Sequence, residues 1–130
     1  KAFDVKDGYG IAHILPRLGI VPVIITGRTS GIVEHRAREL DITELYQGVS
    51  DKLAQLKAVA QKYAAEPAEI AYIGDDRNDG DCLRFCGVTA CPSDAADEIK
   101  EMATYVCRKG GGRGAVREFI DWLASSASDV

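Results

Sequence analysis

Short apolar runs rich in β-branched residues alternate along this chain with stretches whose apolar residues recur at helical spacing. The runs at 21–25, 70–73, 88–90 and 105–107 have the length of strands, and the weakest candidate lies at 45–47. Helices between strands are the connections that parallel pairing requires. The pattern therefore predicts an α/β fold, in which a parallel sheet carries helices on both faces.

The predicted helices are marked by apolar residues three and four positions apart. They lie at 11–18, 33–40, 53–63, 81–85, 95–102 and 116–123. Pro16 should bend the end of the first helix, and Ser50 is the predicted N-cap of the third. Because the run 70–73 is apolar throughout, we expect it to form a fully buried strand.

A chain of 130 residues suits one domain, which we place at residues 1–130. Hydrophobic residues make up 46% and charged residues 28%, which excludes a disordered or fibrous chain. The net charge of -4 argues against nucleic acid as a partner, because a phosphate backbone calls for a basic surface. No apolar run approaches the roughly 20 residues of a membrane helix. We therefore expect neither a nucleic-acid nor a membrane partner.

The cysteines are few and lie in the second half of the chain, at Cys82, Cys86, Cys91 and Cys107. None of them forms a Cys-x-x-Cys pair, and both histidines lie far away in the sequence. A zinc site is therefore the weaker interpretation. We expect four small buried side chains in a reducing cytoplasm.

Polar residues follow the first predicted strand directly. Thr26, Gly27 and Arg28 supply a hydroxyl, accessible backbone N–H groups and a guanidinium, all of which suit phosphate oxygens. Ligands of open α/β sheets bind beyond the carboxyl ends of the strands, where these residues are expected. An ordinary polar turn between strand and helix explains the same three residues equally well, so both interpretations stay open.

Three carboxylates follow the strand at 70–73, where Asp75, Asp76 and Asp79 stand within five residues. Such a cluster repels itself unless a cation neutralises it, and Mg²⁺ is the usual hard cation beside a bound phosphate. A solvated turn is the weaker alternative. Lys52 lies in the first turn of its predicted helix, where a cation opposes the helix dipole. It is a candidate charge partner for a phosphoryl group.

These motifs together resemble those of haloacid dehalogenase (HAD) superfamily phosphatases, and the resemblance covers nearly the whole chain. The branch that the chain most resembles acts on 3-deoxy-D-manno-octulosonate (KDO) 8-phosphate in lipopolysaccharide sugar synthesis. The matching stretches are Lys6-Asp7-Gly8-x-Gly10-Ile11, Ile25-Thr26-Gly27-Arg28, Ser50-Asp51-Lys52, Gly74-Asp75-Asp76-x-x-Asp79 and Gly111-Gly112-Arg113-Gly114-Ala115-Val116-Arg117-Glu118.

The resemblance implies an Mg²⁺-dependent phosphoric monoester hydrolase with a Rossmann-like three-layer HAD sandwich. Thr26 would hydrogen-bond the transferring phosphoryl group, and Lys52 would stabilise its charge and that of the nucleophile. Asp75 would ligate Mg²⁺, with Asp79 and Asp76 supporting the metal shell. These are the catalytic and metal-binding residues that we expect.

The resemblance also implies how the substrate is bound. Gly27 and Arg28 would face a small phosphorylated sugar acid. Proteins of this branch are typically cytoplasmic homotetramers, in which the glycine-rich segment, here around Arg113, can reach the active site of a neighbouring subunit.

One part of the family pattern is not found in the 130 residues. The family's first motif, Asp-x-Asp on the first strand, carries the aspartate nucleophile, and no Asp-x-Asp directly follows an apolar strand here. The resemblance implies that this first, central strand is missing from the chain, which is then N-terminally incomplete. We expect the strands ending at Ile25 and Ile73 to face each other across its place.

Two alternatives to the eight-carbon substrate stay open. The chain could belong to a phosphatase of nine-carbon, sialic-acid-type 9-phosphates. It could also be a non-catalytic oligomerisation domain associated with an acylneuraminate cytidylyltransferase. The presence of both the Thr-Gly-Arg and the Asp-Asp motifs favours the enzyme.

Overall fold

The computed structural model describes residues 5–128. Its strands all pair in parallel, as Ile24 opposite Leu45 and Tyr72 opposite Thr89 illustrate. The strands are β1 (Val23–Ile25), β2 (Glu44–Tyr46), β3 (Ala71–Ile73), β4 (Val88–Cys91) and β5 (Tyr105–Val106). Helices connect them in sequence, so the predicted α/β class with parallel strands is confirmed.

The helices predicted at 33–40, 53–63, 81–85, 95–102 and 116–123 are confirmed close to those positions, whereas the predicted helix at 11–18 is replaced by π-helical and 3-10 turns that follow a short unpredicted helix. The α-helices are α1 (Val5–Tyr9), α2 (Gly31–Glu39), α3 (Lys52–Lys62), α4 (Gly80–Phe85), α5 (Asp97–Met102) and α6 (Ala115–Ser128). After α1 the chain continues through a π-helical turn (Gly10–Ile14) and a 3-10 turn (Leu15–Leu18), where Pro16 stands near the start. Further 3-10 turns lie at Pro67–Glu69 and Arg77–Asp79. None of the helices within residues 5–128 is long and apolar enough to cross a bilayer.

The N-cap of α3 differs from the prediction. Asp51, and not Ser50, caps the helix, because its side chain accepts a hydrogen bond from the Ala54 N–H at 3.0 Å. Both residue types are good caps, so composition alone could not choose between neighbours. The shift makes Lys52 the first residue of the helix.

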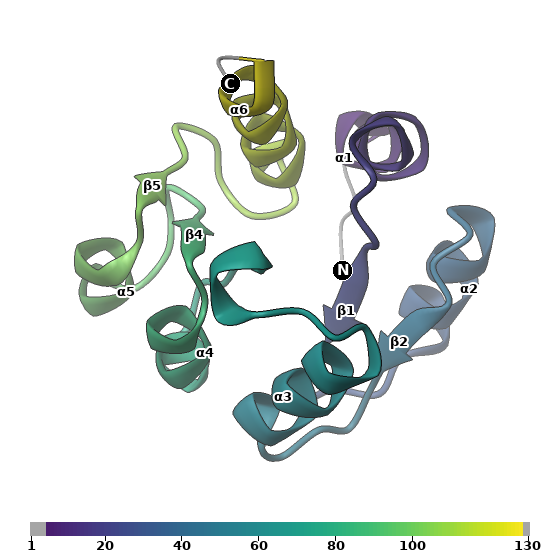
Figure 1. Ribbon diagram of the computed structural model, residues 1–130, viewed down its shortest axis with the longest axis horizontal. Helices are drawn as coiled ribbons and strands as arrows, with labels where there is room; N and C mark the ends of the chain where they lie inside the picture. Colours follow the sequence, from purple (N-terminus) through teal and green to yellow (C-terminus); the bar gives the residue numbers. More distant parts are fainter. Residues whose placement is uncertain (1–4, 129–130) are drawn as a thin grey trace.

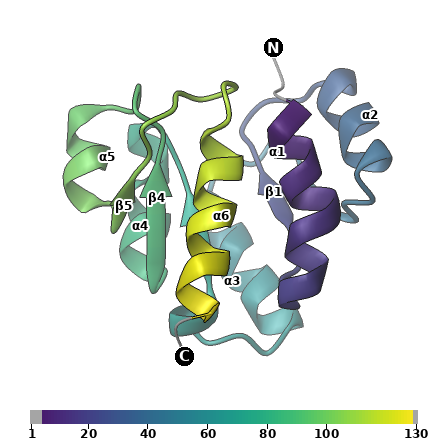
Figure 2. The same ribbon diagram turned by 90° about the horizontal axis from the view of Figure 1, so that it is seen from above.

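Helices cover both faces of the strands. On one face α3, α4 and α5 pack through residues such as Leu56, Leu83 and Ile99. On the other face α6 packs against β4 and β5, and Figure 2 shows it lying beside α1. The backbone N–H of Arg117 donates to Asp7 at 2.8 Å and ties α6 to α1. This is the predicted arrangement of a helical layer on each side of the strands.

The four cysteines are buried and free, as expected. Cys91 ends β4 and Cys107 directly follows β5, but the two side chains pack into different clusters, on opposite faces of the sheet. Burial raises the pKa of Cys86 and Cys107 to about 12, so these thiols keep their protons at neutral pH. They act as small apolar side chains in the core.

The strands form two separate sheets, which lie on opposite sides of the view in Figure 1. One sheet holds β1 and β2, and the other holds β3, β4 and β5. Within the described residues, β1 and β3 each have one paired edge, whereas β4 is paired on both sides. Accordingly Thr89, Ala90 and Cys91 of β4 are buried, but Ala71 of β3 is exposed. The prediction of a fully buried strand at 70–73 is therefore wrong, because one edge of that strand has no neighbour within residues 5–128.

Candidate active site

The loops after β1 and β2 are joined by backbone hydrogen bonds. The N–H of Thr26 donates to Tyr46 O at 3.0 Å, and Val49 N–H donates back to Thr26 O at 3.0 Å. Gly48, at a φ of 65°, donates to Arg28 O at 3.0 Å. Because a positive φ suits glycine, this close turn explains the glycine at position 48. The loop that carries the Thr26 hydroxyl and the Arg28 guanidinium is therefore held in place by backbone hydrogen bonds.

The predicted phosphate-binding side chains stand at the open end of that loop. The Thr26 hydroxyl accepts a hydrogen bond from the Arg28 N–H at 3.2 Å. The Arg28 side chain is exposed, and its guanidinium makes no hydrogen bond or ion pair with any residue that the structure describes. A guanidinium without a protein partner keeps all of its donors for a ligand.

The loop after β3 presents two carboxylates to solvent. Its backbone is anchored on both sides, since Gly74 N–H donates to Ala90 O and Asp75 O accepts from Ala96 N–H, each at 3.1 Å. Asp76 caps the following 3-10 turn by accepting the Arg77 N–H at 2.7 Å. The Asp75 carboxylate is exposed and has no hydrogen bond or ion pair within residues 5–128. It is the most available anionic ligand of this loop.

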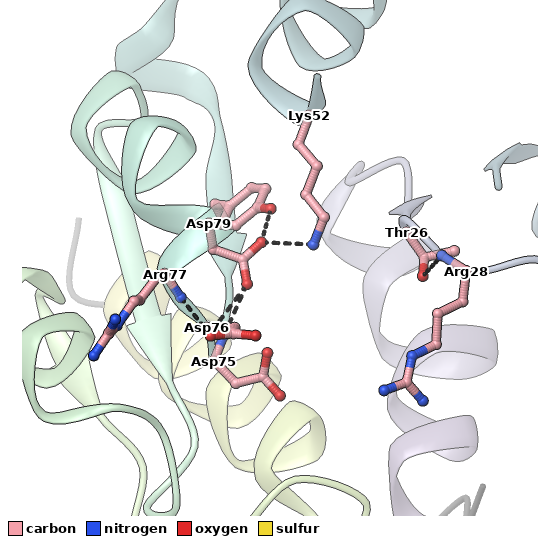
Figure 3. A network of polar contacts seen from close by, with 8 residues as sticks. Thr26, Arg28, Lys52, Asp75, Asp76, Arg77 and Asp79 are labelled. Atoms are coloured by element: carbon pink, nitrogen blue, oxygen red, sulfur yellow. Dashed lines mark hydrogen bonds and ion pairs between the residues drawn. The ribbon is translucent and has the colours of Figure 1, made fainter. Parts of the chain in front are cut away.

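The third carboxylate of the motif, Asp79, is buried at 3% exposure and is fully engaged. Its Oδ1 accepts hydrogen bonds from Lys52 Nζ at 3.0 Å and from the Tyr72 hydroxyl at 2.6 Å. Its Oδ2 accepts the backbone N–H groups of Asp75 at 3.1 Å and Asp76 at 3.3 Å. Figure 3 shows this network reaching from the loop to the Lys52 side chain. We call Asp79, Tyr72 and Lys52 the Asp79 network.

The charge states within the Asp79 network follow from burial and hydrogen bonding. Burial acts to raise the pKa of Asp79, but the hydrogen bonds from Tyr72 and Lys52 outweigh it and lower the pKa. Burial, and then the bond to Asp79, raise the pKa of Tyr72. Asp79 is therefore a carboxylate and Tyr72 a neutral donor at neutral pH. The Lys52 side chain is only 14% exposed, so this ion pair is shielded from solvent.

Gly74 is required by the position of Asp79. A Cβ atom at residue 74 would lie 2.7 Å from Cβ and from Cγ of Asp79, well inside contact distance. The glycine of the Gly-Asp-Asp motif thus makes room for the buried carboxylate behind the loop.

The structure brings some of the predicted site residues together and leaves others apart. Lys52 meets the loop after β3 through Asp79, as a shared site requires. Thr26 and Arg28 lie apart from the aspartates in Figure 3, and the end of the Lys52 side chain lies between them and Asp79 in that view. Arg113 is exposed in the turn before α6, where the neighbouring Gly111 N–H donates to Asp94 Oδ1 at 2.9 Å. No contact joins Arg113 to the other predicted site residues within residues 5–128.

The three predicted metal-binding residues differ in what their side chains contact. No group of three or more His, Cys, Asp or Glu side chains within residues 5–128 is placed to hold a metal ion. Asp79 was expected to support the metal shell. Its side chain contacts the loop by accepting the backbone N–H groups of Asp75 and Asp76, and it is also held by Lys52 and Tyr72. Sequence reasoning also missed Tyr72, which lies two residues before Gly74 and whose position on an apolar strand indicated only a core side chain.

The remaining donors still fit a hard divalent cation. Mg²⁺ in proteins is commonly held by one or two carboxylates, with water and substrate phosphate completing its shell. Asp75 and Asp76 supply exposed carboxylate oxygens at the end of a strand. The guanidinium of Arg28 and the Thr26 hydroxyl supply donors suited to an anion. The arrangement can therefore hold a phosphate ester together with a metal ion.

Comparisons with known proteins agree with this chemistry. A family model for haloacid dehalogenase-like hydrolases matches residues 24–120. The chain therefore belongs to the haloacid dehalogenase-like hydrolases.

Its relatives narrow the resemblance further. A 3-deoxy-D-manno-octulosonate 8-phosphate phosphatase of Escherichia coli is 45% identical over 123 residues, covering 95% of this chain and 65% of that protein. The crystal structure of such a phosphatase from Yersinia pestis matches with a TM-score of 0.94 at 42% identity, covering 98% of this chain and 69% of the other. One from Moraxella catarrhalis, in complex with magnesium, phosphate and KDO, matches with a TM-score of 0.92 at 38% identity, covering 97% and 72%. This chain spans 65% of the length of the curated relatives that it matches.

Proposed function

We propose that this chain is the larger part of an Mg²⁺-dependent phosphatase that hydrolyses KDO 8-phosphate in lipopolysaccharide sugar synthesis. The observation that carries the proposal is the Asp79 network, which holds a shielded lysine beside the exposed carboxylates of Asp75 and Asp76 at the end of β3. The 45% identity to a KDO 8-phosphate phosphatase extends over 95% of the chain and supports the same substrate.

Each site residue has a role in this proposal. Lys52 stabilises the negative charge of the transferring phosphoryl group, since an ammonium held in place in a shielded site needs little reorganisation. The Thr26 hydroxyl donates a hydrogen bond to a phosphoryl oxygen. Arg28, with the open backbone at Gly27, binds the carboxylate or hydroxyl groups of the sugar acid.

The metal belongs to the same proposal. Asp75 is the principal ligand, and Asp76 supports the shell directly or through water. When bound, Mg²⁺ neutralises phosphate charge and orients the ester. Asp79 contributes by fixing the backbone N–H groups of Asp75 and Asp76, which sets where the two carboxylates stand.

The nucleophile is proposed to come from a strand between β1 and β3. These two strands each have one unpaired edge within the described residues, although both are half-buried near their ends. Unpaired backbone groups at such edges cost on the order of 1–3 kcal/mol each if they are shielded from water. A strand in this place, carrying Asp-x-Asp at its carboxyl end, would complete a single sheet. It would put a carboxylate between Thr26 and Lys52.

The comparisons favour the eight-carbon substrate over the two alternatives. The relatives reported above are KDO 8-phosphate phosphatases, and none of them is described as acting on a nine-carbon phosphate. A non-catalytic oligomerisation domain has no need of a shielded lysine or of free carboxylates.

Assembly and location complete the proposal. We propose a homotetramer in which the exposed Arg113 approaches the substrate of a neighbouring subunit. The four free cysteines support a reducing compartment, and we propose the cytoplasm. Residues 1–130 form one HAD-like domain in this view, completed by the upstream strand.

The test uses the full-length protein, expressed with the coding sequence that precedes residue 1, beside the 130-residue chain. Phosphate release from KDO 8-phosphate and from a nine-carbon sugar-acid phosphate is measured with and without Mg²⁺. We expect Mg²⁺-dependent release by the full-length protein, preference for the eight-carbon substrate, and no release by the 130-residue chain. A full-length protein that releases no phosphate, or an upstream sequence without Asp-x-Asp, would contradict the proposal.

A further inference from the structure

We propose that Tyr72 is a positioning residue for phosphoryl transfer, which acts through Asp79 to hold the ammonium group of Lys52. The inference rests on the proposed function and adds a role for a side chain that acts through another residue.

The geometry supports this role because Tyr72 and Lys52 bind the same oxygen. Asp79 Oδ1 accepts the Tyr72 hydroxyl at 2.6 Å and Lys52 Nζ at 3.0 Å. Lys52 comes from the start of α3, 27 residues before Asp79 in sequence, and its flexible side chain has to be fixed by a partner. With the tyrosine in place, Oδ1 has one direction occupied and can receive the ammonium group only from the other.

Tyr72 itself is held rigidly enough to act in this way. It lies in β3, and its ring packs against two core clusters, one containing Leu83 and Ile99 and the other containing Leu56. The packed ring therefore holds the Tyr72 hydroxyl in a fixed position. A carboxylate that accepts a hydrogen bond from a fixed hydroxyl keeps its orientation better than one that is held by the flexible lysine alone.

The two carboxylate oxygens of Asp79 bind different partners. Oδ1 accepts a hydrogen bond from Lys52, whereas Oδ2 accepts the backbone N–H groups of Asp75 and Asp76, the proposed metal ligands. Removing the Tyr72 hydroxyl leaves both bonds to Oδ2 intact. The change should therefore disturb the lysine without changing how the metal loop is held.

The experiment compares Tyr72→Phe with the wild type in the full-length protein. We expect kcat for KDO 8-phosphate to fall about 10- to 100-fold, the range seen when a partner that orients an active-site ligand is removed. The Mg²⁺ concentration for half-maximal rate should stay unchanged, and KM should change little. Labelling of Lys52 by an amine-reactive reagent, followed by peptide mass spectrometry, should become several-fold faster.

A matched control is Tyr63→Phe. Tyr63 donates its hydroxyl to Glu44 Oε2 at 2.8 Å, so this variant also removes a tyrosine hydroxyl from a buried carboxylate. Thermal unfolding followed by circular dichroism confirms that both variants are folded. The control should leave kcat and the labelling of Lys52 unchanged.

The outcomes separate this inference from the proposed function. If the wild type hydrolyses no KDO 8-phosphate, the proposed function fails, and the labelling rate of Lys52 still decides whether Tyr72 positions it. Wild-type kcat and wild-type labelling in folded Tyr72→Phe would overturn the inference. So would an equal loss of activity in Tyr63→Phe, because Tyr72 would then serve only the fold.

Discussion

Within residues 5–128, two buried carboxylates are each held by a lysine and by tyrosine, and they lie in different regions. Asp79 follows β3 and binds Lys52 and Tyr72. Glu44 opens β2 and accepts Lys62 Nζ at 2.6 Å, the Tyr63 hydroxyl at 2.8 Å, and the Tyr46 hydroxyl. We call Glu44 and its three partners the Glu44 network. The same side-chain chemistry therefore occurs twice in one chain.

The surroundings of the two carboxylates differ. Glu44 stands at the amino end of its strand, away from the loops that follow β1 and β3, and its lysine side chain is 58% exposed. Asp79 stands beyond the carboxyl end of β3, its lysine is 14% exposed, and two backbone N–H groups of a loop complete its bonds. In parallel sheets ligands bind at the carboxyl ends of strands. Position in the sheet, and not the chemistry of the network, therefore supports our proposal that Asp79 rather than Glu44 serves the site.

Asp75 sharpens this comparison because its carboxylate belongs to neither network. We expect Asp75→Asn to lower Mg²⁺-dependent turnover by at least about a thousandfold, since the principal metal ligand is lost. The unfolding temperature of Asp75→Asn should equal that of the wild type or rise slightly, because the charge of Asp75, which repels that of Asp76, is removed. Phosphate release at varied Mg²⁺ and thermal unfolding measure both effects. Near-full activity at ordinary Mg²⁺ would show that another residue holds the metal. Asp97→Asn, at an exposed carboxylate in the first turn of α5, is the control.

The two lysines should respond differently to the same substitution. Lys52→Met should lower kcat about 100- to 1,000-fold, because a fixed charge on the transferring group is lost. The shielded ion pair between Lys52 and Asp79 makes this lysine matter for stability as well. Leaving Asp79 unpaired should cost about 3–5 kcal/mol of unfolding free energy. Lys62→Met should lower the urea midpoint of unfolding and leave kcat as it is. Equal activity losses in both variants would break the comparison.

Gly74 tests whether the position of Asp79 matters. The Cβ of Gly74→Ala would meet Asp79 at 2.7 Å, and relieving that contact should cost about 1–3 kcal/mol. The displaced carboxylate should also reduce kcat. Gly31→Ala is a suitable control, because a Cβ there meets no atom within 4 Å. Urea unfolding of both variants measures the difference, and a fully stable, fully active Gly74→Ala would show that the loop adapts freely.

The smallest expected effect is the pH dependence of the Glu44 network. Hydrogen bonds from Lys62, and then from Tyr46 and Tyr63, lower the pKa of Glu44 from 4.5 to about 2. A lowered pKa in the folded state stabilises the fold above pH 4.5, and this contribution disappears as the pH falls from 4.5 to about 2. Urea midpoints over this range should therefore fall more steeply for the wild type than for Glu44→Gln. Parallel curves would show that Glu44 is not held in this way.

The sequence predicted the parts of this molecule that depend on local signals. Apolar periodicity located the strands and the helices after residue 30, and the residues that follow β1 and β3 indicated the candidate site. The Lys52–Asp79 ion pair joins residues 27 positions apart and depends on how α3 packs beside β3, which periodicity does not encode. The role of Tyr72 was missed for a related reason. A tyrosine on an apolar strand indicates a core side chain, and the sequence does not show which residue its hydroxyl contacts. The exposure of Ala71 was missed because strand burial depends on which neighbours pair.

The most direct test of the comparison measures kcat for KDO 8-phosphate in full-length Asp79→Asn and Glu44→Gln, each first shown to be folded by circular dichroism. We expect folded Asp79→Asn to lose at least about a hundredfold in kcat, since it releases Lys52 from its fixed position. Glu44→Gln should stay within about twofold of the wild type, as expected for a residue remote from the chemistry. Full activity in Asp79→Asn, or an equal loss in Glu44→Gln, would contradict the assignment of one network to the site and the other to the fold.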